Sequence, residues 1–195
     1  YLCLRFLVLG ICVLHFLQLT VRGVPCMYYG EEIGMTDARI PFSEGLDPIS
    51  QKMKNVPRFF FDLAGETPNR DELRTPMQWN NSINAGFSSA KKTWLPVHNN
   101  FTELNVEKES KDKASLLSAI MQLLKIRNEL AAINKGDLKL LDSKKLPPNI
   151  LAYKRKAGEE EIMIILSFTK RHREFEIEGN WQSLFQLNQE DNYRG

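Results

Sequence analysis

The chain has 195 residues, of which 43% are hydrophobic and 26% charged, and its formal net charge is +2. This is the composition of a globular protein with one large domain or two small ones. The charge is too small for a nucleic-acid footprint, and no stripe of Lys and Arg is interleaved with aromatic residues, so we expect no nucleic-acid partner.

The first twenty residues are strongly apolar, with an unbroken run at residues 6–14. A membrane span needs about 20 apolar residues, roughly twice this run. No small-residue cleavage pattern follows it, as it would after a signal peptide. We therefore predict a buried helix or strand of a larger fold and expect no membrane span.

The cysteines are few and grouped, with Cys3, Cys12 and Cys26 all in the first 26 residues. Their spacing fits neither a zinc site nor a redox pair, so we predict buried thiols and no metal site. Free thiols favour a reducing compartment, and we expect a cytoplasmic protein. The glycosylation sequons at Asn80 and Asn100 would instead suit secretion.

Residues 21–35 are predicted to form a short strand, with Gly23 and Pro25 at its start and Gly30 at its end. In residues 36–109 the pattern becomes irregular, and six prolines preclude a long helix or a central strand. Irregular segments far longer than the usual loop of about 4–6 residues are functional or disordered in most proteins. Two tryptophans and several phenylalanines argue against disorder here.

The last part of the chain changes from a helical period to a period of two. A helix is predicted over residues 112–133, where apolar residues recur at spacings of three and four, and Gly136 is placed for a left-handed C-terminal cap. Residues 149–156 and 161–168 predict a hairpin, and residues 173–179 predict a strand with one wet face. A small antiparallel sheet domain is therefore expected from about residue 136.

The histidines and the paired acids do not group at catalytic spacing. His15, His98 and His172 are scattered, which disfavours a triad or a metal site. Glu31 and Glu32 are adjacent on the predicted strand, so their side chains would point to opposite faces and would not form one acid–base pair.

Residues 70–79, RDELRTPMQW, place two acids, Asp71 and Glu72, among arginines, an arrangement that usually forms structural ion pairs. Arginine also presents a rigid fork of donors that suits vicinal hydroxyls. The following proline makes Thr75 extended, which fixes how Arg74 is aimed, and a tryptophan offers a flat apolar face nearby. A sugar-facing Arg74 is thus one interpretation, and a structural polar loop is the other.

Two longer motifs resemble a known family. Residues 22–35, RGVPCMYYGEEIGM, resemble the last barrel-strand motif of the α-amylase-type glycoside hydrolases, in which Gly-x-Pro is followed by Tyr and by Gly-x-Glu. Residues 70–89, RDELRTPMQWNNSINAGFSS, followed by TWLPV, closely resemble the α-glucosidase and oligo-1,6-glucosidase branch of that family. The resemblance covers about residues 17–180.

The resemblance implies an α/β plus all-β fold class, namely the C-terminal end of a TIM (β/α)8 barrel followed by an antiparallel β-sandwich domain, both incomplete. Residues 1–134 would hold the last strand, the long active-site loop and the last helix of the barrel. Residues 135–195 would form the C-terminal β domain.

The resemblance also implies retaining hydrolysis of terminal α-glucosidic bonds in short oligosaccharides, by two carboxylates about 5–5.5 Å apart. The family's catalytic carboxylates and calcium ligands precede the residues present here, so no catalytic residue, metal or other cofactor is assigned. By resemblance, Arg74 closes the glucose subsite together with an aspartate from early in the barrel. Arg70 is a candidate for the neighbouring subsite. The expected partner is an α-linked gluco-oligosaccharide.

Two alternatives share this barrel. Heavy subunits of amino-acid transporters are non-catalytic binding partners with an N-terminal membrane helix, but their span precedes the whole barrel, whereas the apolar opening here adjoins its last strand. A sugar isomerase or transglycosylase would differ mainly in residues further upstream. One strand of an eight-stranded barrel leaves open edges, so we expect the isolated chain neither to fold stably nor to hydrolyse maltose or isomaltose.

Overall fold

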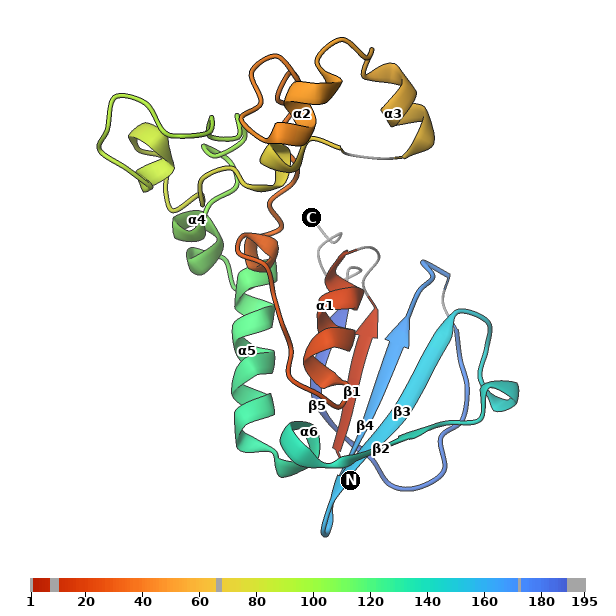
Figure 1. Cartoon of the computed structure of the whole chain (residues 1–195). Helices are drawn as coiled ribbons and strands as arrows, with labels where there is room; N and C mark the ends of the chain where they lie inside the picture. Colours follow the sequence, from red (N-terminus) through yellow and green to blue (C-terminus); the bar gives the residue numbers. More distant parts are fainter. Residues whose placement is uncertain (1, 8–10, 66–67, 172, 189–195) are drawn as a thin grey trace. The chain divides into compact units, whose positions relative to one another are not determined.

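The structure is a computed structural model that describes residues 2–7, 11–65, 68–171 and 173–188 (Figure 1). Its contacts divide the chain into two compact units. The sheet unit comprises Tyr1–Met27 and Ser118–Gly195, and the loop unit comprises Tyr28–Leu117. The division at residue 134 that the family resemblance implies stays a prediction.

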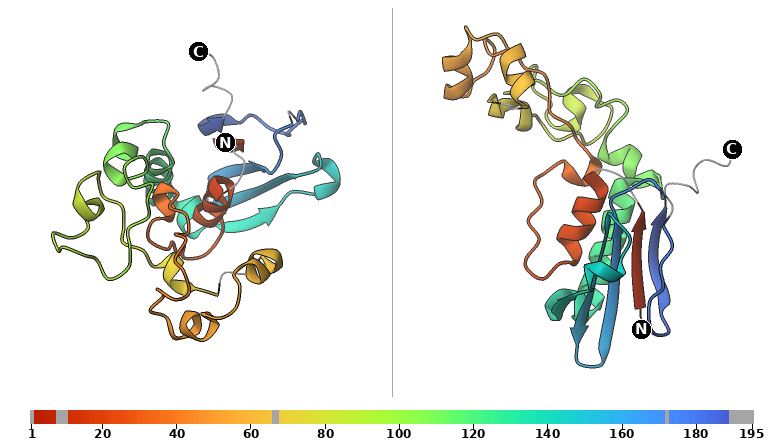
Figure 2. Two further views of the ribbon diagram at one scale, coloured as in Figure 1. Left: turned by 90° about the horizontal axis from the view of Figure 1, so that it is seen from above. Right: turned by 90° about the vertical axis from the view of Figure 1, so that its right-hand side faces the viewer.

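A five-stranded sheet organises the sheet unit, in the order β2-β3-β4-β1-β5. Strand β1 runs parallel to both of its neighbours, whereas the β2–β3 and β3–β4 pairs are antiparallel (Figures 1 and 2). The small antiparallel sheet predicted from residue 136 is therefore present, and β1 extends it into a mixed sheet. The strands are β1 (Leu2–Leu7), β2 (Asp137–Leu140), β3 (Ile150–Ala157), β4 (Glu160–Ser167) and β5 (Gln182–Asn188).

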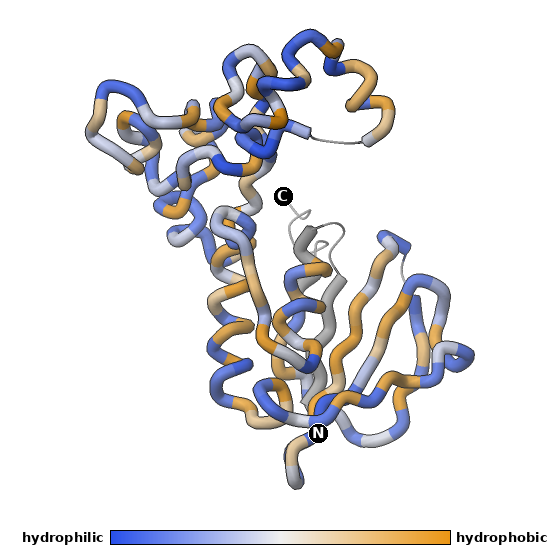
Figure 3. The backbone as a smooth tube through the Cα atoms, in the orientation of Figure 1, coloured by the Kyte–Doolittle hydropathy of each residue, from blue (hydrophilic) through white to orange (hydrophobic). Residues whose placement is uncertain are grey.

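The predicted hairpin is confirmed by β3 and β4, which are joined at Gly158 with φ 58°. Every residue of β4 from Ile162 to Ser167 is buried, and Figure 3 shows the apolar run along this strand. On one face, Met163 and Ile165 pack with Ala152. Helices α1 and α6 contact the same strand. A strand covered on both faces needs no polar alternation, which explains the continuous apolar run.

The strand predicted at residues 173–179 is wrong, because this segment pairs with no other strand in the described chain. Its alternation still reports burial, since Phe175 and Ile177 pack against the β3–β4 apolar cluster while the intervening glutamates are exposed. The alternation of apolar and charged residues thus predicted which side chains face the core. It did not predict whether the backbone pairs with a neighbouring strand. The strand in this region is β5, which pairs with β1.

The described part of the apolar opening forms a strand and a helix, and the helix agrees with the prediction of a buried element. Helix α1 (Ile11–Thr20) follows β1 and lies against one face of the sheet (Figures 1 and 2). Val13, Phe16 and Leu19 of this helix are buried. No helix among the described residues has both the length and the apolar character needed to cross a membrane.

Two buried arginines cap the last turn of α1. Arg127, in α5 (Leu116–Glu129), donates to the carbonyl of Leu19 at 2.6 Å. Arg155, in β3, donates to the carbonyls of Thr20 at 2.5 Å and Gly136 at 2.9 Å. The last carbonyls of a helix lack intrahelical partners and carry partial negative charge, so guanidinium donors satisfy both needs.

The helix predicted over residues 112–133 is confirmed in the main, as α5 and the following α6 (Ala131–Lys135). The left-handed cap predicted at Gly136 is wrong, because this residue has φ −66° and ψ 160°. Glycine is needed there for space instead. A Cβ would lie 2.4 Å from the carbonyl oxygen of Ala132 and 2.6 Å from that of Lys156.

The strand predicted at residues 21–35 is also wrong. Its described backbone pairs with no strand, and Glu31–Ile33 forms a 3-10 helix. Gly30 and Gly34 bracket that turn with φ 89° and 71°, a left-handed conformation that an extended strand does not contain. The apolar residues of this segment therefore belong to a turn rather than to a paired β-strand.

The irregular segment 36–109 behaves as predicted, since its described part contains no strand and only short helices. Ala38, Ile40 and Leu95 form a small apolar cluster inside it. Such a segment relies on turns and side-chain hydrogen bonds rather than on long periodic elements. Its α-helices are α2 (Pro48–Met53), α3 (Phe59–Ala64) and α4 (Val106–Lys111), and its 3-10 helices after residue 36 are Arg70–Leu73 and Ile83–Gly86.

Candidate functional site

The RDELRTPMQW motif begins as the 3-10 helix Arg70–Leu73 and continues as a buried extended segment. Asn69 caps the turn by accepting a hydrogen bond from the Asp71 amide at 3.3 Å, and it is fully buried. The segment from Thr75 to Gln78 is buried, whereas the side chain of Arg74 is 47% exposed and Trp79 is 49% exposed. The motif thus presents one guanidinium and one indole at the two ends of a fixed stretch of backbone.

The two predicted arginines meet at a carboxylate that sequence reasoning missed. Arg70 Nε lies 2.7 Å and Arg74 Nη1 lies 3.3 Å from Asp47 Oδ2. Asp47 also caps α2, because its Oδ1 accepts a hydrogen bond from the Ile49 amide at 2.8 Å. The Asp-Pro pair at residues 47 and 48 is a signal for a helix start, but it contains no information about the arginines.

The charges of this cluster are mutually stabilised. The hydrogen bond from Arg70, followed by that from the Ile49 amide, lowers the pKa of Asp47. Reciprocally, the hydrogen bond to Asp47 raises the pKa of Arg70. The Asp47 side chain is only 1% exposed, so its negative charge depends on these donors rather than on water.

The two acids of the motif have structural partners. Asp71 Oδ2 accepts hydrogen bonds from the amides of Leu46 at 2.6 Å and Asp47 at 2.8 Å. Asp71 therefore holds the backbone at Leu46 and Asp47 in place. The predicted ion pair with an arginine is wrong for this acid, because main-chain amides bind its carboxylate instead.

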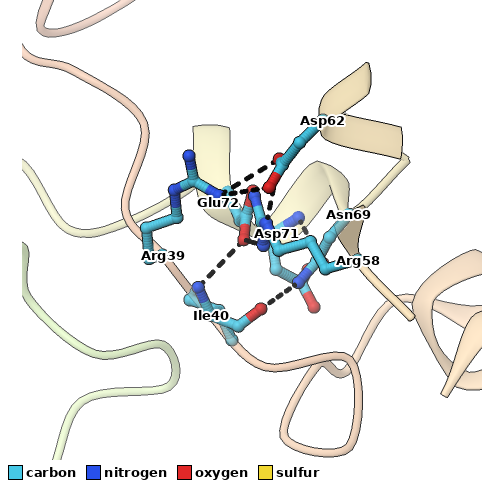
Figure 4. Close-up of polar contacts among 7 residues, drawn as sticks. All are labelled: Arg39, Ile40, Arg58, Asp62, Asn69, Asp71 and Glu72. Atoms are coloured by element: carbon cyan, nitrogen blue, oxygen red, sulfur yellow. Dashed lines mark hydrogen bonds and ion pairs between the residues drawn. The ribbon is translucent and has the colours of Figure 1, made fainter. Parts of the chain in front are cut away.

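Glu72 does form the expected structural ion pair, although its partner, Arg58, lies outside the motif. Arg58 Nη2 is 2.7 Å from Glu72 Oε2, and Glu72 Oε1 accepts a hydrogen bond from the Ile40 amide at 2.9 Å. Figure 4 shows that Arg39 and Arg58 converge on Asp62 and Glu72. Two cations and two anions balance there, so this network holds the loop together without a net charge.

Arg74 opens onto a cavity of about 530 Å3, which suits a small ligand. Most of its lining is apolar or aromatic, and Arg74 is joined there by one acid, Glu32. The predicted combination of a guanidinium with an aromatic face is therefore present, whereas Arg70 does not line the cavity. The lining residues are Tyr29, Glu32, Arg74, Pro76, Met77, Trp79, Phe87, Trp94 and Leu95.

The glycine-flanked turn from the first family motif forms part of the rim. Glu32 Oε2 accepts a hydrogen bond from the Gly30 amide at 2.7 Å, which ties this carboxylate to the turn. The Tyr29 hydroxyl donates to the carbonyl of Thr75 at 3.1 Å. Burial, followed by the neighbouring Tyr28, raises the pKa of Tyr29 to about 12, so its hydroxyl stays neutral. Both contacts involve residues that line the cavity, so they help to fix its wall.

A short left-handed turn supports the aromatic wall. Asn84, Ala85 and Gly86 have φ of 53°, 56° and 70°. The carbonyl of Ala85 accepts hydrogen bonds from the amides of Trp79 at 2.9 Å and Asn80 at 3.1 Å. Left-handed backbone costs a non-glycine residue about 1–2 kcal/mol, so the surrounding contacts must hold this turn in place. Sequence reasoning missed this turn, although Asn84 and Gly86 are residue types that favour positive φ and could have indicated it.

This arrangement can offer hydrogen-bond donors and apolar surfaces to a neutral, hydroxyl-rich molecule. The guanidinium supplies donors, and the aromatic rings supply flat surfaces for C–H groups. Glu32 is the one carboxylate among the lining residues that the structure describes, whereas glycoside cleavage uses a pair. Within residues 2–7, 11–65, 68–171 and 173–188, no three His, Cys, Asp or Glu side chains are grouped to hold a metal ion.

Comparisons with known proteins agree with the motifs. Residues 7–136 match the family model described as "Alpha amylase, catalytic domain". The chain is 37% identical over 146 residues to a salivary α-glucosidase of Aedes aegypti, covering 75% of this chain and 23% of that protein. It is 35% identical over 176 residues to an oligo-1,6-glucosidase of Parageobacillus thermoglucosidasius, covering 84% of this chain and 29% of that one.

Solved structures show the same relationship. The trehalulose synthase MutB from Pseudomonas mesoacidophila MX-45 superimposes with a TM-score of 0.68 at 30% identity, covering 81% of this chain and 29% of that chain. The chain therefore spans between a quarter and a third of the length of most of these proteins. The family-model match, at residues 7–136, includes the whole of the loop unit, Tyr28–Leu117.

Proposed function

Because the chain belongs to the α-amylase catalytic-domain family, whose relatives include α-glucosidases and oligo-1,6-glucosidases, we propose that it is part of an α-glucosidase and supplies one wall of its glucose pocket. The substrate would be a short oligosaccharide with a terminal α-linked glucose. The chain would bind the sugar, and the bond-breaking groups would come from other segments of the protein.

The observation that carries this proposal is the cavity shared by Arg74 and Trp79. In the part of the chain that the structure describes, Nη1 is the one guanidinium nitrogen of Arg74 with a hydrogen-bond partner, namely Asp47. The remaining guanidinium donors are available for sugar hydroxyls. The indole of Trp79, 49% exposed, offers the apolar surface against which a pyranose ring packs.

The proposed chemistry is retaining hydrolysis, as in the family branch whose motifs the chain shares. One carboxylate attacks the anomeric carbon while a second carboxylic acid protonates the leaving oxygen, and the two groups lie about 5–5.5 Å apart. The chain contributes orientation of the terminal glucose, which raises the rate by holding the anomeric carbon where the carboxylates act.

The test is the substitution Arg74→Ala in the full-length protein that contains this chain. A charge-assisted hydrogen bond is worth about 1.5–3 kcal/mol, so kcat/KM for p-nitrophenyl α-glucoside and isomaltose should fall about tenfold to a hundredfold. Arg22→Ala is a matched control, because Arg22 also pairs with an aspartate, Asp137 at 3.1 Å, but at the surface of the sheet unit. Equal kinetics for wild type and Arg74→Ala would refute the proposal.

The similarity to MutB supports a second candidate, a sugar isomerase built on the same loop motif. The two activities are separated by their products from one substrate. With sucrose, a hydrolase releases glucose and fructose, whereas an isomerase releases a rearranged disaccharide. Product analysis by chromatography would show which of the two predominates.

A further inference from the structure

We infer that Asp47 is the positioning residue of this site: its buried carboxylate holds the Arg74 guanidinium at the cavity, and Arg70 together with Asp71 holds Asp47. This inference rests on the proposed sugar-binding role of Arg74. It assigns a role to a side chain that touches no substrate and acts through a residue that does.

The side chains of Arg74 and Asp47 are in direct contact. Arg74 Nη1 lies 3.3 Å from Asp47 Oδ2, and the Arg74 side chain is 47% exposed. A long, half-exposed arginine samples many rotamers unless a partner restricts it. Asp47, with a 1% exposed side chain, is an anchored partner rather than a mobile surface acid.

Asp47 is itself held in place by two residues of the motif. Arg70 Nε donates to its carboxylate at 2.7 Å, while the Asp71 carboxylate accepts a hydrogen bond from the Asp47 amide at 2.8 Å. The adjacent residues Arg70 and Asp71 therefore bind the side chain and the backbone of Asp47, respectively. Its Oδ1 caps α2 through the Ile49 amide at 2.8 Å, which fixes the remaining oxygen.

The two arginines that contact Asp47 have different positions relative to the cavity. Arg74 lines the cavity, and Arg70 does not. Arg70 makes the shorter contact with Asp47, at 2.7 Å against 3.3 Å for Arg74. The tighter pair provides support, and the looser pair leaves the Arg74 guanidinium able to meet a ligand.

The decisive experiment is a double-mutant cycle with Asp47→Asn and Arg74→Ala in the full-length protein. Asparagine is as good a helix cap as aspartate, so Asp47→Asn retains the start of α2 and removes the charge that holds Arg74. We expect kcat/KM for isomaltose to fall about tenfold in Asp47→Asn. On the Arg74→Ala background the same substitution should change kcat/KM by less than about twofold, because its effect passes through Arg74.

Two further variants separate the loss of Arg74 positioning from the general effect of altering a helix cap. Arg70→Gln removes the support without touching the buried carboxylate, and it should produce a smaller fall that is not additive with Asp47→Asn. Asp142→Asn is the matched control, since Asp142 also caps a short helix by accepting from the Lys144 amide, at 3.0 Å, but lies outside the arginine cluster. Its kinetics should equal those of wild type.

The outcomes separate the inference from the proposed function. If Arg74→Ala lowers kcat/KM and Asp47→Asn does not, the positioning role is overturned while the sugar-binding role stands. A full Asp47→Asn effect on the Arg74→Ala background would overturn it too, since that pattern shows a purely structural role. Unchanged kinetics in Arg74→Ala would remove both the proposed function and the inference built on it.

Discussion

The carbonyl of Ala85 accepts hydrogen bonds from the amides of both Trp79 and Asn80, although Ala85 itself has a left-handed backbone with φ 56°. Ala85 is completely buried. The turn that contains it therefore fixes where the indole of Trp79 stands in the cavity wall. Backbone in an unfavourable conformation at a candidate site is retained when the contacts around it outweigh its cost.

The first prediction concerns this turn. Ala85→Val should destabilise the protein by about 2 kcal/mol or more, because a β-branched residue is disfavoured at positive φ and the site has no room. Ala85→Gly should leave stability nearly unchanged, since glycine adopts this conformation freely. Urea unfolding of the full-length protein that contains this chain measures both, with Ala90→Val, at an exposed residue, as control. Equal stability for the valine and glycine variants at residue 85 would contradict the role of the turn.

The second prediction concerns the buried arginine of β3. Arg155 is fully buried and donates to the carbonyls of Thr20 and Gly136, and burial, followed by the nearby Arg127, lowers its pKa. Arg155→Met leaves both carbonyls without donors, so we expect a loss of about 2–4 kcal/mol in unfolding free energy.

The neighbouring Lys156→Met provides the control for that experiment, because Lys156 is exposed on the same strand. It should change the unfolding free energy by less than about 0.5 kcal/mol. A wild-type melting temperature for Arg155→Met would mean that water satisfies these carbonyls.

The third prediction concerns how the stability of the fold depends on pH through Asp47. The hydrogen bond from Arg70 depresses the pKa of Asp47 below its ordinary value of 3.8 in the folded protein. Asp47 therefore stabilises the fold at pH values above 3.8, and this contribution is lost as the pH falls through the lower, folded-state pKa. Asp47→Asn should accordingly weaken the fold at neutral pH and show a flatter loss of stability in acid. Urea midpoints across the acid range measure it, and parallel curves would contradict it.

The fourth prediction concerns the 195-residue chain by itself. Several large apolar side chains are exposed, among them Leu63 at 78%, Phe59 at 61% and Met121 at 60%. Such surfaces favour association, so the isolated chain should elute as aggregates in size-exclusion chromatography and should not turn over p-nitrophenyl α-glucoside. A monodisperse chain with glucosidase activity would refute this prediction.

Local sequence signals predicted the elements that depend on neighbours in the chain. The β3–β4 hairpin, the helix α5 and the lack of long helices and strands in the described part of residues 36–109 follow from periodicity and prolines. The errors at residues 21–35 and 173–179 share one cause. Both segments have strand-like patterns, but a strand exists only where a partner backbone is available.

The sequence by itself determined the family, through motifs that fall in a specific order, and it identified Arg74 and Trp79 as a candidate pair. Only the tertiary structure decided what those residues meet. Asp47 lies 23 positions from Arg70 and 27 from Arg74, and β1 enters the sheet between β4 and β5 from the other end of the chain. Such contacts depend on the closure of long loops. Neither the local periodicity nor the local propensity of a segment predicts that closure.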